Sequence, residues 1–221
     1  MTTAIVGAGS IGGTVARLLS NSGEPIILAA GHVPEEAAHE IGGNVSATTV
    51  ADAIDRSEVV VLAVWFDVMK QVVEDNKGRL AGKVVIDTCN PVTFDDAGTP
   101  SRTLPNGVSA GSVIAGLLPD SAHYVKAFGT LAAKTLQSQA HRSPERGVLF
   151  FATDDDTAQA AAARLITAAG YDPVRAGGLD AALQLEMFGD LHEFGGLNGQ
   201  VLDRRQAQAA VGPTAGGGTA R

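Results

Sequence analysis

A short apolar segment at residues 3–6 runs directly into three glycines with the spacing G-x-G-x-x-G, and helix-forming residues follow up to position 19. Gly7 lets the chain turn sharply out of a strand, Gly9 has no Cβ to keep a pyrophosphate away from the backbone, and Gly12 lets the new helix pack closely on the sheet. The start of that helix directs unpaired N–H groups and the positive end of its dipole at the phosphates. The motif predicts a strand–turn–helix that binds a dinucleotide; a glycine-rich turn without a ligand is the alternative.

Apolar, β-branched segments alternate with helix-like segments along the chain. We expect strands at residues 25–29, 45–48, 59–64, 83–87, 123–128, 147–153 and 172–175. The continuous apolar segment 59–64 is typical of a central parallel strand that is buried on both faces. The alternation predicts an α/β protein with a Rossmann-type, doubly wound, mainly parallel sheet and extra C-terminal strands and helix.

Length and composition indicate one domain. The 221 residues, 45% of them hydrophobic, suffice for a Rossmann-type domain at residues 1–203, with a C-terminal extension from about residue 123. Residues 204–221 are polar and glycine-rich, and we expect them to form a flexible tail. The net charge of −8 disfavours nucleic acid, and no segment approaches the length of a membrane span. Cys89 is the single cysteine, which fits a reducing compartment, so we expect a cytoplasmic protein.

The residues after the second expected strand bear on which dinucleotide binds. NAD enzymes usually place Asp or Glu here to accept hydrogen bonds from the ribose. This chain instead has Ala29, Ala30, Gly31 and His32. The missing acid leaves room for the 2′-phosphate of NADP, and His32 is the candidate partner for that phosphate; an exposed loop histidine is the alternative.

Two acidic segments invite comparison with metal sites. The aspartates at 154–156 precede a helix, and carboxylates there are ordinary caps. His192 and Glu193 begin the zinc motif H-E-x-x-H, but Gly196 stands in place of the second histidine. We therefore predict no metal site.

A second pocket is expected beside the first. Trp65 and Phe66 follow the strand at 59–64, and a long loop reaching Gly107 follows the next strand, at the edge where open α/β sheets bind ligands. This pocket favours an enzyme over a dinucleotide sensor, which needs only the first pocket. Cys89 is expected to be a small buried residue. Lys126 either supports its strand or binds an acidic substrate.

Four segments in order resemble the NADPH-dependent coenzyme F420 reductases, which are also described as coenzyme F420-dependent NADP oxidoreductases. The segments are residues 5–12, 87–91, 124–128 and 147–152, and the likeness extends from about Thr3 to Phe188. The resemblance implies a hydride transfer between NADP(H) and a deazaflavin, coenzyme F420, or a similar flat conjugated acceptor. An NADPH-dependent reductase of a small carbonyl or imine is an alternative.

The resemblance implies contacts rather than acid–base roles, so no catalytic side chain is assigned. Its cofactor contacts would be Gly7, Ala8, Gly9, Ser10, Ile11 and Gly12 at the pyrophosphate, Gly31 and His32 where the family usually has Ser-Arg, Ala63, Val64 and Trp65 at the ribose and nicotinamide, and Asn90 and Pro91 at the nicotinamide. The expected substrate pocket comprises Phe66, Lys126 and Met187. Gly129 replaces the asparagine that commonly ends the family's Lys-Ala-Phe-Asn segment. The expected partners are a small-molecule acceptor and a second copy of the chain.

Overall fold

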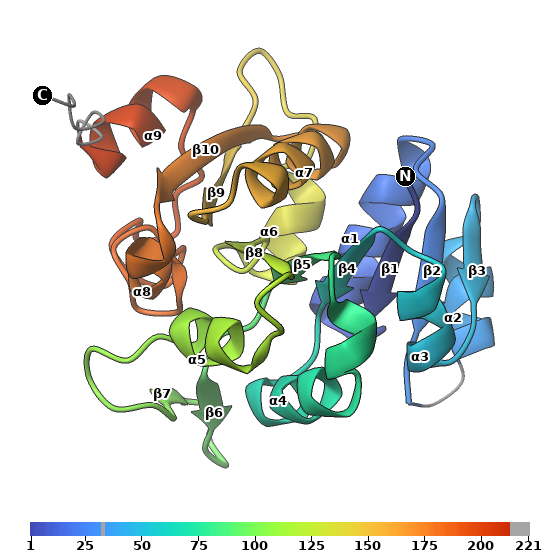
Figure 1. The fold of residues 1–221 in the computed structure, drawn as a ribbon. Coiled ribbons are helices and arrows are strands. Elements are labelled where there is room, and N and C mark those ends of the chain that lie inside the picture. Colours follow the sequence, from blue (N-terminus) through green and yellow to red (C-terminus); the bar gives the residue numbers. More distant parts are fainter. Residues whose placement is uncertain (32–33, 213–221) are drawn as a thin grey trace, which may run out of the picture.

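Eight strands form a sheet in the order β10-β9-β8-β5-β4-β1-β2-β3 (Figure 1). The computed structural model describes residues 1–31 and 34–212. Six strands are parallel: β1 (Thr3–Val6), β2 (Ile26–Ala29), β3 (Val45–Ala47), β4 (Val59–Leu62), β5 (Val84–Asp87) and β8 (His123–Ala127). Beyond them β9 (Val148–Ala152) runs antiparallel to β8, and β10 (Asp172–Gly177) runs parallel to β9. The predicted Rossmann-type fold is confirmed.

Helices cover both faces of the sheet because alternate strand residues point to opposite faces. Ile5 and Val61 pack on one face, and Val6 and Val60 on the other. The first face is covered by α1 (Ser10–Asn21), α2 (Pro34–Ile41), α6 (Ala133–Ser138) and α7 (Asp156–Ala168). The second is covered by α3 (Val50–Asp55), α4 (Phe66–Asp75), the short 3-10 helix η1 (Lys77–Leu80) and α5 (Ala110–Leu117). As predicted, an aspartate caps α7, since the Asp155 carboxylate accepts a hydrogen bond from the N–H of Ala158 at 2.8 Å.

The sheet has a switch point between β1 and β4. The chain leaves β1 through α1 on one face and leaves β4 through α4 on the opposite face, so the two connections separate above the carboxyl ends of these strands. Ligands of open α/β sheets bind in the crevice that this divergence creates.

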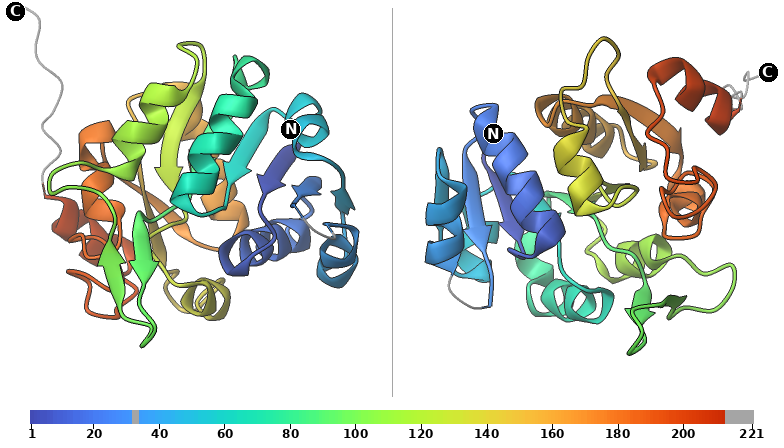
Figure 2. Two further views of the ribbon diagram at one scale, coloured as in Figure 1. Left: turned by 90° about the horizontal axis from the view of Figure 1, so that it is seen from below. Right: turned by 180° about the vertical axis from the view of Figure 1, so that it is seen from behind.

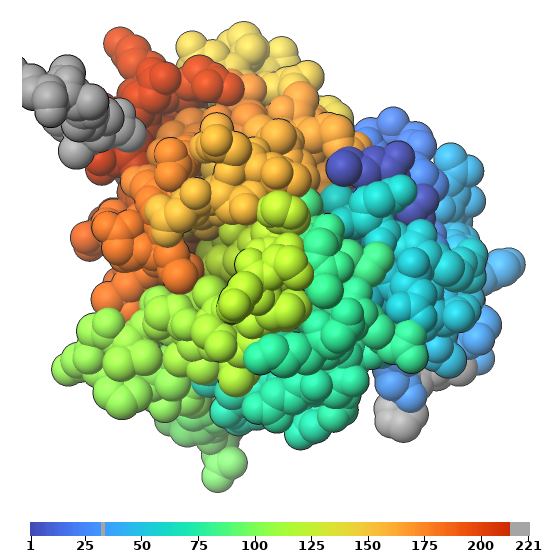
Figure 3. Space-filling model, viewed as in Figure 1, coloured from blue at the N-terminus to red at the C-terminus, as the bar shows by residue number. Residues whose placement is uncertain are grey.

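The expected long loop after β5 contains a small hairpin. Strands β6 (Val92–Phe94) and β7 (Pro100–Arg102) pair antiparallel and are separate from the main sheet. Seen from below, the hairpin lies outside the sheet, on the same side of the view as α1 and α6 (Figure 2). It projects from the lower end of the molecule (Figure 3).

The C-terminal part packs on the antiparallel end of the sheet. The expected helix at 179–188 is shorter and consists of the 3-10 helix η2 (Leu179–Ala181) and α8 (Ala182–Leu185). The predicted flexible tail is wrong for residues 204–211, which form α9 (Arg204–Val211). Asp203 and Gln206 close its first turn as a capping box, and Ala207 is buried in the core. The remaining tail, 213–221, lies outside the described residues.

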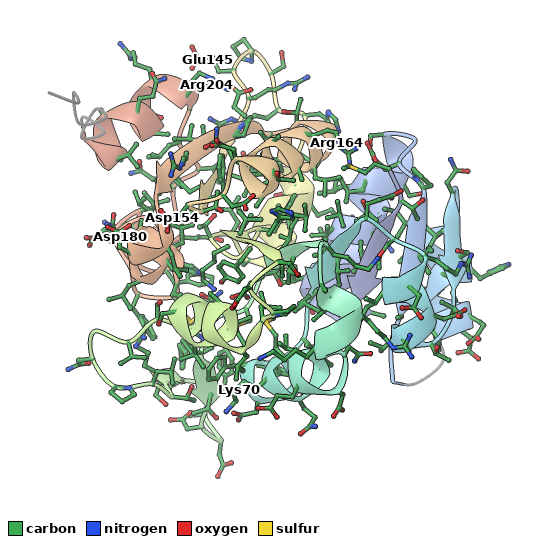
Figure 4. The ribbon with its side chains drawn as sticks, viewed as in Figure 1. Lys70, Glu145, Asp154, Arg164, Asp180 and Arg204 are labelled. Atoms are coloured by element: carbon green, nitrogen blue, oxygen red, sulfur yellow. The ribbon has the colours of Figure 1, made fainter. Side chains whose placement is uncertain are left out.

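Ion pairs link segments far apart in the chain. Arg164 of α7 pairs with Glu24 before β2, and Arg204 of α9 lies 3.1 Å from Asp172 of β10 (Figure 4). Within residues 1–31 and 34–212, no helix combines the length and apolar character needed to cross a membrane. The expected homodimer and cytoplasmic location stay predictions.

Candidate active site

A cavity of about 690 Å³ lies at the carboxyl ends of β1, β4 and β5, at the switch point of the sheet. Its floor is the glycine loop, and its walls come from segments that are distant in the sequence. Lining residues from the first half include Gly7, Ala8, Gly9, Ser10, Ile11, Gly31, Ala63, Val64, Trp65, Asn90 and Phe94. Those from the second half include Leu131, Ala132, Met187, His192 and Phe194.

Each of the three glycines of the loop is required for a different structural reason. Gly7 has a φ of +110°, and a Cβ there would lie 2.3 Å from the carbonyl oxygen of Ala63. A Cβ on Gly12 would lie 1.9 Å from the carbonyl oxygen of Gly7, so this glycine lets α1 approach the loop. A Cβ on Gly9 would meet no protein atom within 4 Å, because it would point into open space. Gly7 and Gly12 therefore shape the loop, and Gly9 leaves room for a ligand.

Four of the described residues expected at the ligand do not line the cavity, namely Gly12, Pro91, Phe66 and Lys126. Gly12 faces the loop, as described above. Pro91 is buried, and its carbonyl oxygen accepts a hydrogen bond from the N–H of Thr103. Phe66 begins α4 with its ring turned into the core beside Met69, so its assignment to the substrate pocket is wrong. His32 lies outside the described residues.

Lys126, the fourth of them, is also wrongly assigned to the substrate pocket, because it lies behind the cavity in a buried ion network. Its ammonium group donates to the Asp87 carboxylate at 3.2 Å and to the carbonyl oxygen of Cys89 at 2.7 Å, and it lies 3.7 Å from Glu186. Burial by itself lowers the pKa of Lys126, but the charges of Asp87 and Glu186 outweigh it and raise that pKa above its usual value. Tyr124 completes the cluster by donating to Asp87 at 2.7 Å. Lys126 therefore supports the sheet rather than contacting a substrate.

Glu186 connects the buried ion network of Lys126 to the hairpin. Its carboxylate accepts from the backbone N–H of Gly111 and from the guanidinium of Arg102, both at 3.2 Å. Glu186 is fully buried, and Arg102 lies on β7. The two acids and two bases of the network balance in charge, so the hairpin is tied to the sheet without an unpaired buried charge.

Asn90 lies at the wall of the cavity with its amide held at both ends. Its Nδ2 donates to the carbonyl oxygen of Gly129 at 2.9 Å, and its Oδ1 accepts from the N–H of Met187 at 2.6 Å. The side chain thus joins the end of β5 to the ends of β8 and α8. A nicotinamide beside Asn90 would contact a side chain whose orientation these two bonds fix.

Sequence reasoning missed the contribution of residues 187–194 beyond Met187. His192 and Phe194 reach the cavity through a series of tight turns after α8 that carries no helical or strand periodicity. Glu193 points the other way and accepts hydrogen bonds from the N–H of Ala132 and the hydroxyl of Thr135, both at 2.6 Å. These bonds hold the start of α6 against the turns. The signal that could have identified this segment is Glu193, an acid that stands between His192 and Phe194 in a glycine-rich stretch.

Of the described residues, two titratable side chains line the cavity, and both are held neutral. Burial lowers the pKa of His192 from 6.5 to about 4, although the charge of Glu193 and a hydrogen bond to the backbone of Gly129 partly oppose this. The Nδ1 of His192 accepts from the N–H of Phe194 at 3.0 Å, which requires an unprotonated Nδ1. Burial and the nearby charge of Asp87 raise the pKa of the Cys89 thiol well above its usual value. Cys89 is thus buried and unreactive, as predicted.

The buried, neutral His192 predicts a loss of stability in acid. Unfolded His192 binds a proton near pH 6.5, whereas the folded chain resists protonation until about pH 4. Stability is therefore lost as the pH falls through this range, by about 3 kcal/mol. Denaturant unfolding between pH 7 and pH 4 measures it.

In that experiment, His192→Asn is expected to remove most of the acid slope, because Asn keeps an acceptor for the N–H of Phe194 but does not titrate. His39→Asn on the exposed face of α2 is the matched control and should retain the wild-type slope. Equal slopes for wild type and His192→Asn would contradict a buried neutral imidazole.

Comparison with known proteins agrees with this geometry. Residues 2–91 match the family model described as NADP oxidoreductase coenzyme F420-dependent. The resemblance to that family is confirmed over these residues. The matched part of the chain ends at Pro91. It contains the glycine loop and β1 to β5 but none of the cavity residues that follow.

Solved structures extend the similarity beyond the family segment. A hypothetical protein, SMa0349 from Sinorhizobium meliloti, is 28% identical, with 92% of this chain and 96% of that one covered at a TM-score of 0.78. A candidate F420-dependent NADP-reductase from Arthrobacter sp. FB24 is 24% identical, covering 82% and 87% at a TM-score of 0.71. A pyrroline-5-carboxylate reductase from Coxiella burnetii shares the fold at 18% identity, with 86% and 64% covered and a TM-score of 0.61. A comparison with curated protein sequences finds no match.

The glycine at position 129 has a structural reason. A Cβ on Gly129 would lie 2.6 Å from the carbonyl oxygen of Thr88, so no larger residue fits without moving the end of β5. The Asn90 amide occupies the space beside Gly129 and bonds to its carbonyl oxygen. This contact thus closes the junction of β5 and β8.

Proposed function

We propose that the protein is an NADP(H)-dependent oxidoreductase that transfers a hydride between nicotinamide and a flat conjugated acceptor, coenzyme F420 being the one that the family description suggests. The observation that carries the proposal is the continuity of the cavity. It joins the open space above Gly9, where a pyrophosphate fits, to an aromatic wall formed by Trp65, Phe94 and Phe194. A protein that only senses a dinucleotide has no use for the second part.

The residues fit a dinucleotide at the glycine-loop end. The backbone N–H groups at the start of α1 face the cavity, and the helix dipole adds positive potential there. Gly31 lines the cavity at the end of β2, where no acid opposes a 2′-phosphate. When bound there, NADPH supplies the hydride.

The chain's part in the reaction is positioning. His192 and Cys89 are neutral with pKa values shifted away from neutrality, so neither is suited to proton transfer at pH 7. Lys126 is paired and lies outside the cavity. The rate enhancement would then come from holding two rings at reacting distance and excluding water.

The test is NADPH oxidation by the purified protein with a panel of coenzyme F420, flavins, quinones, and small imines and carbonyls. We expect turnover with at least one flat conjugated acceptor. Turnover with imines or carbonyls alone would move the protein to the carbonyl and imine reductases. Binding of NADPH without oxidation by any acceptor would favour the sensor.

A further inference from the structure

Exposed apolar side chains gather around the part of the cavity beyond the glycine loop. Trp65, Phe94 and Phe194 are 63%, 48% and 53% exposed, and all three line the cavity. The rings of Trp65 and Phe94 meet edge to face, and their centroids are 6.2 Å apart. Trp65 directly precedes α4, whereas Phe94 lies in the hairpin. Large apolar side chains grouped at the mouth of a cavity mark a surface that is covered by a ligand.

This part of the cavity offers no charge to a ligand. Among the described residues that line it there is no Lys, Arg, Asp or Glu. His192 and Cys89 are neutral, as shown above. The walls therefore offer stacking and apolar contact but no counter-charge.

Two cations behind the cavity are already committed. Lys126 and Arg102 bind Asp87 and Glu186 in the buried network and cannot turn toward the cavity without leaving a carboxylate unpaired. One N–H and one lone pair of the Asn90 amide are also taken up in bonds to the backbone. An anionic ring entering this space would lose part of its hydration and find no cation among the described lining residues, whereas an uncharged ring of the same shape needs none.

We propose that the acceptor whose ring enters this part of the cavity is uncharged, flat and apolar, of the quinone class, and that anionic rings of the same shape are excluded. The inference rests on the proposed function and narrows its acceptor: a quinone takes the place of coenzyme F420, the acceptor that the family description suggests. In the reaction NADPH + quinone + H⁺ → NADP⁺ + hydroquinone, the hydride carries two electrons to the quinone. The proton comes from water, because His192 and Cys89 are not proton donors at pH 7.

Trp65 supplies a direct readout, because it is the chain's only tryptophan and it lies on the aromatic wall. With the protein saturated by 1,4,5,6-tetrahydro-NADP, whose nicotinamide ring is uncharged and donates no hydride, quenching of Trp65 fluorescence measures acceptor binding alone. The probes are naphthoquinone and its ring-sulfonated counterpart, which share the ring and differ by one negative charge. We expect naphthoquinone to bind at least about tenfold more tightly.

Two matched variants test whether the preference for naphthoquinone over its sulfonated counterpart arises at the aromatic wall. Phe194→Lys puts a cation on the wall and should shrink the preference at least about fivefold or reverse it. Phe188→Lys adds the same charge at a similarly exposed phenylalanine that does not line this cavity, and should leave the preference within about twofold. Thermal unfolding checks that both variants are folded.

The overall charge of −8 could also repel the sulfonate, so salt separates the two causes. Repulsion by the whole protein is screened at high ionic strength, whereas the cost of dehydrating an anion in the cavity persists. A preference that vanishes in salt, equal binding of both probes, or an equal effect of the two lysine variants would overturn the inference. Retained preference in a protein that never oxidises NADPH would contradict the proposed function and leave the uncharged subsite standing.

Discussion

Gly9→Val is expected to abolish NADPH binding while leaving the protein folded. The added side chain would fill the open space where the pyrophosphate fits, and it would meet no protein atom within 4 Å at its Cβ. The φ of −71° and ψ of −168° at Gly9 are open to valine, so the cost to stability should stay within about 1 kcal/mol. The measurement is thermal unfolding with and without NADPH.

At a ligand concentration of one hundred times the dissociation constant, NADPH should stabilise the wild type by about 2.7 kcal/mol and the variant by nothing measurable. Gly116→Val is the matched control, because Gly116 is exposed on α5, has no atom within 4 Å of its Cβ position and lies outside the cavity. NADPH should stabilise this control as it does the wild type. Undiminished stabilisation of Gly9→Val would place the dinucleotide elsewhere.

Lys126→Met is expected to lower the free energy of unfolding by about 3–5 kcal/mol, because it leaves Asp87 and Glu186 buried with one cation fewer. Methionine keeps most of the length of the side chain, so the loss reports the charge rather than a large void. Denaturant unfolding at pH 7 measures the change.

The control for this variant is Lys70→Met, which removes an exposed ion pair with Asp67 on α4 (Figure 4). It should cost less than about 1 kcal/mol, because solvent screens that pair. If the two variants lost similar stability, the buried network would contribute no more than a surface pair. Any folded fraction of Lys126→Met should keep turnover within about tenfold, since the lysine does not reach the cavity.

Local sequence patterns were sufficient to predict a residue's role where that role depends on its neighbours in the chain. The spacing of Gly7, Gly9 and Gly12 predicted the turn into α1, because backbone sterics at each position act over a few residues. The apolar segment at β4 predicted a buried central strand for the same reason, and the aspartate before α7 predicted its cap. These local elements were enough to predict the sheet and the edge where ligands bind.

Tertiary structure decided which side chains reach the ligand. Phe66 and Trp65 are adjacent in sequence, yet the start of α4 turns one ring into the core and leaves the other at the cavity. Lys126 looked like a free cation at a strand end, but Asp87 and Glu186 arrive beside it from segments 39 and 60 residues away along the chain.

The same holds for the aromatic wall of the cavity, which joins Trp65, Phe94 and Phe194. These residues come from the position before α4, from the hairpin and from the turns after α8, and no local sequence pattern links them. The sequence alone determined that a dinucleotide fold would form and where its edge would open, because strand pattern and glycine sterics are short-range. Only the packed structure determined that the described residues lining the cavity at this edge carry no charge, because charge pairing and burial depend on contacts between distant segments.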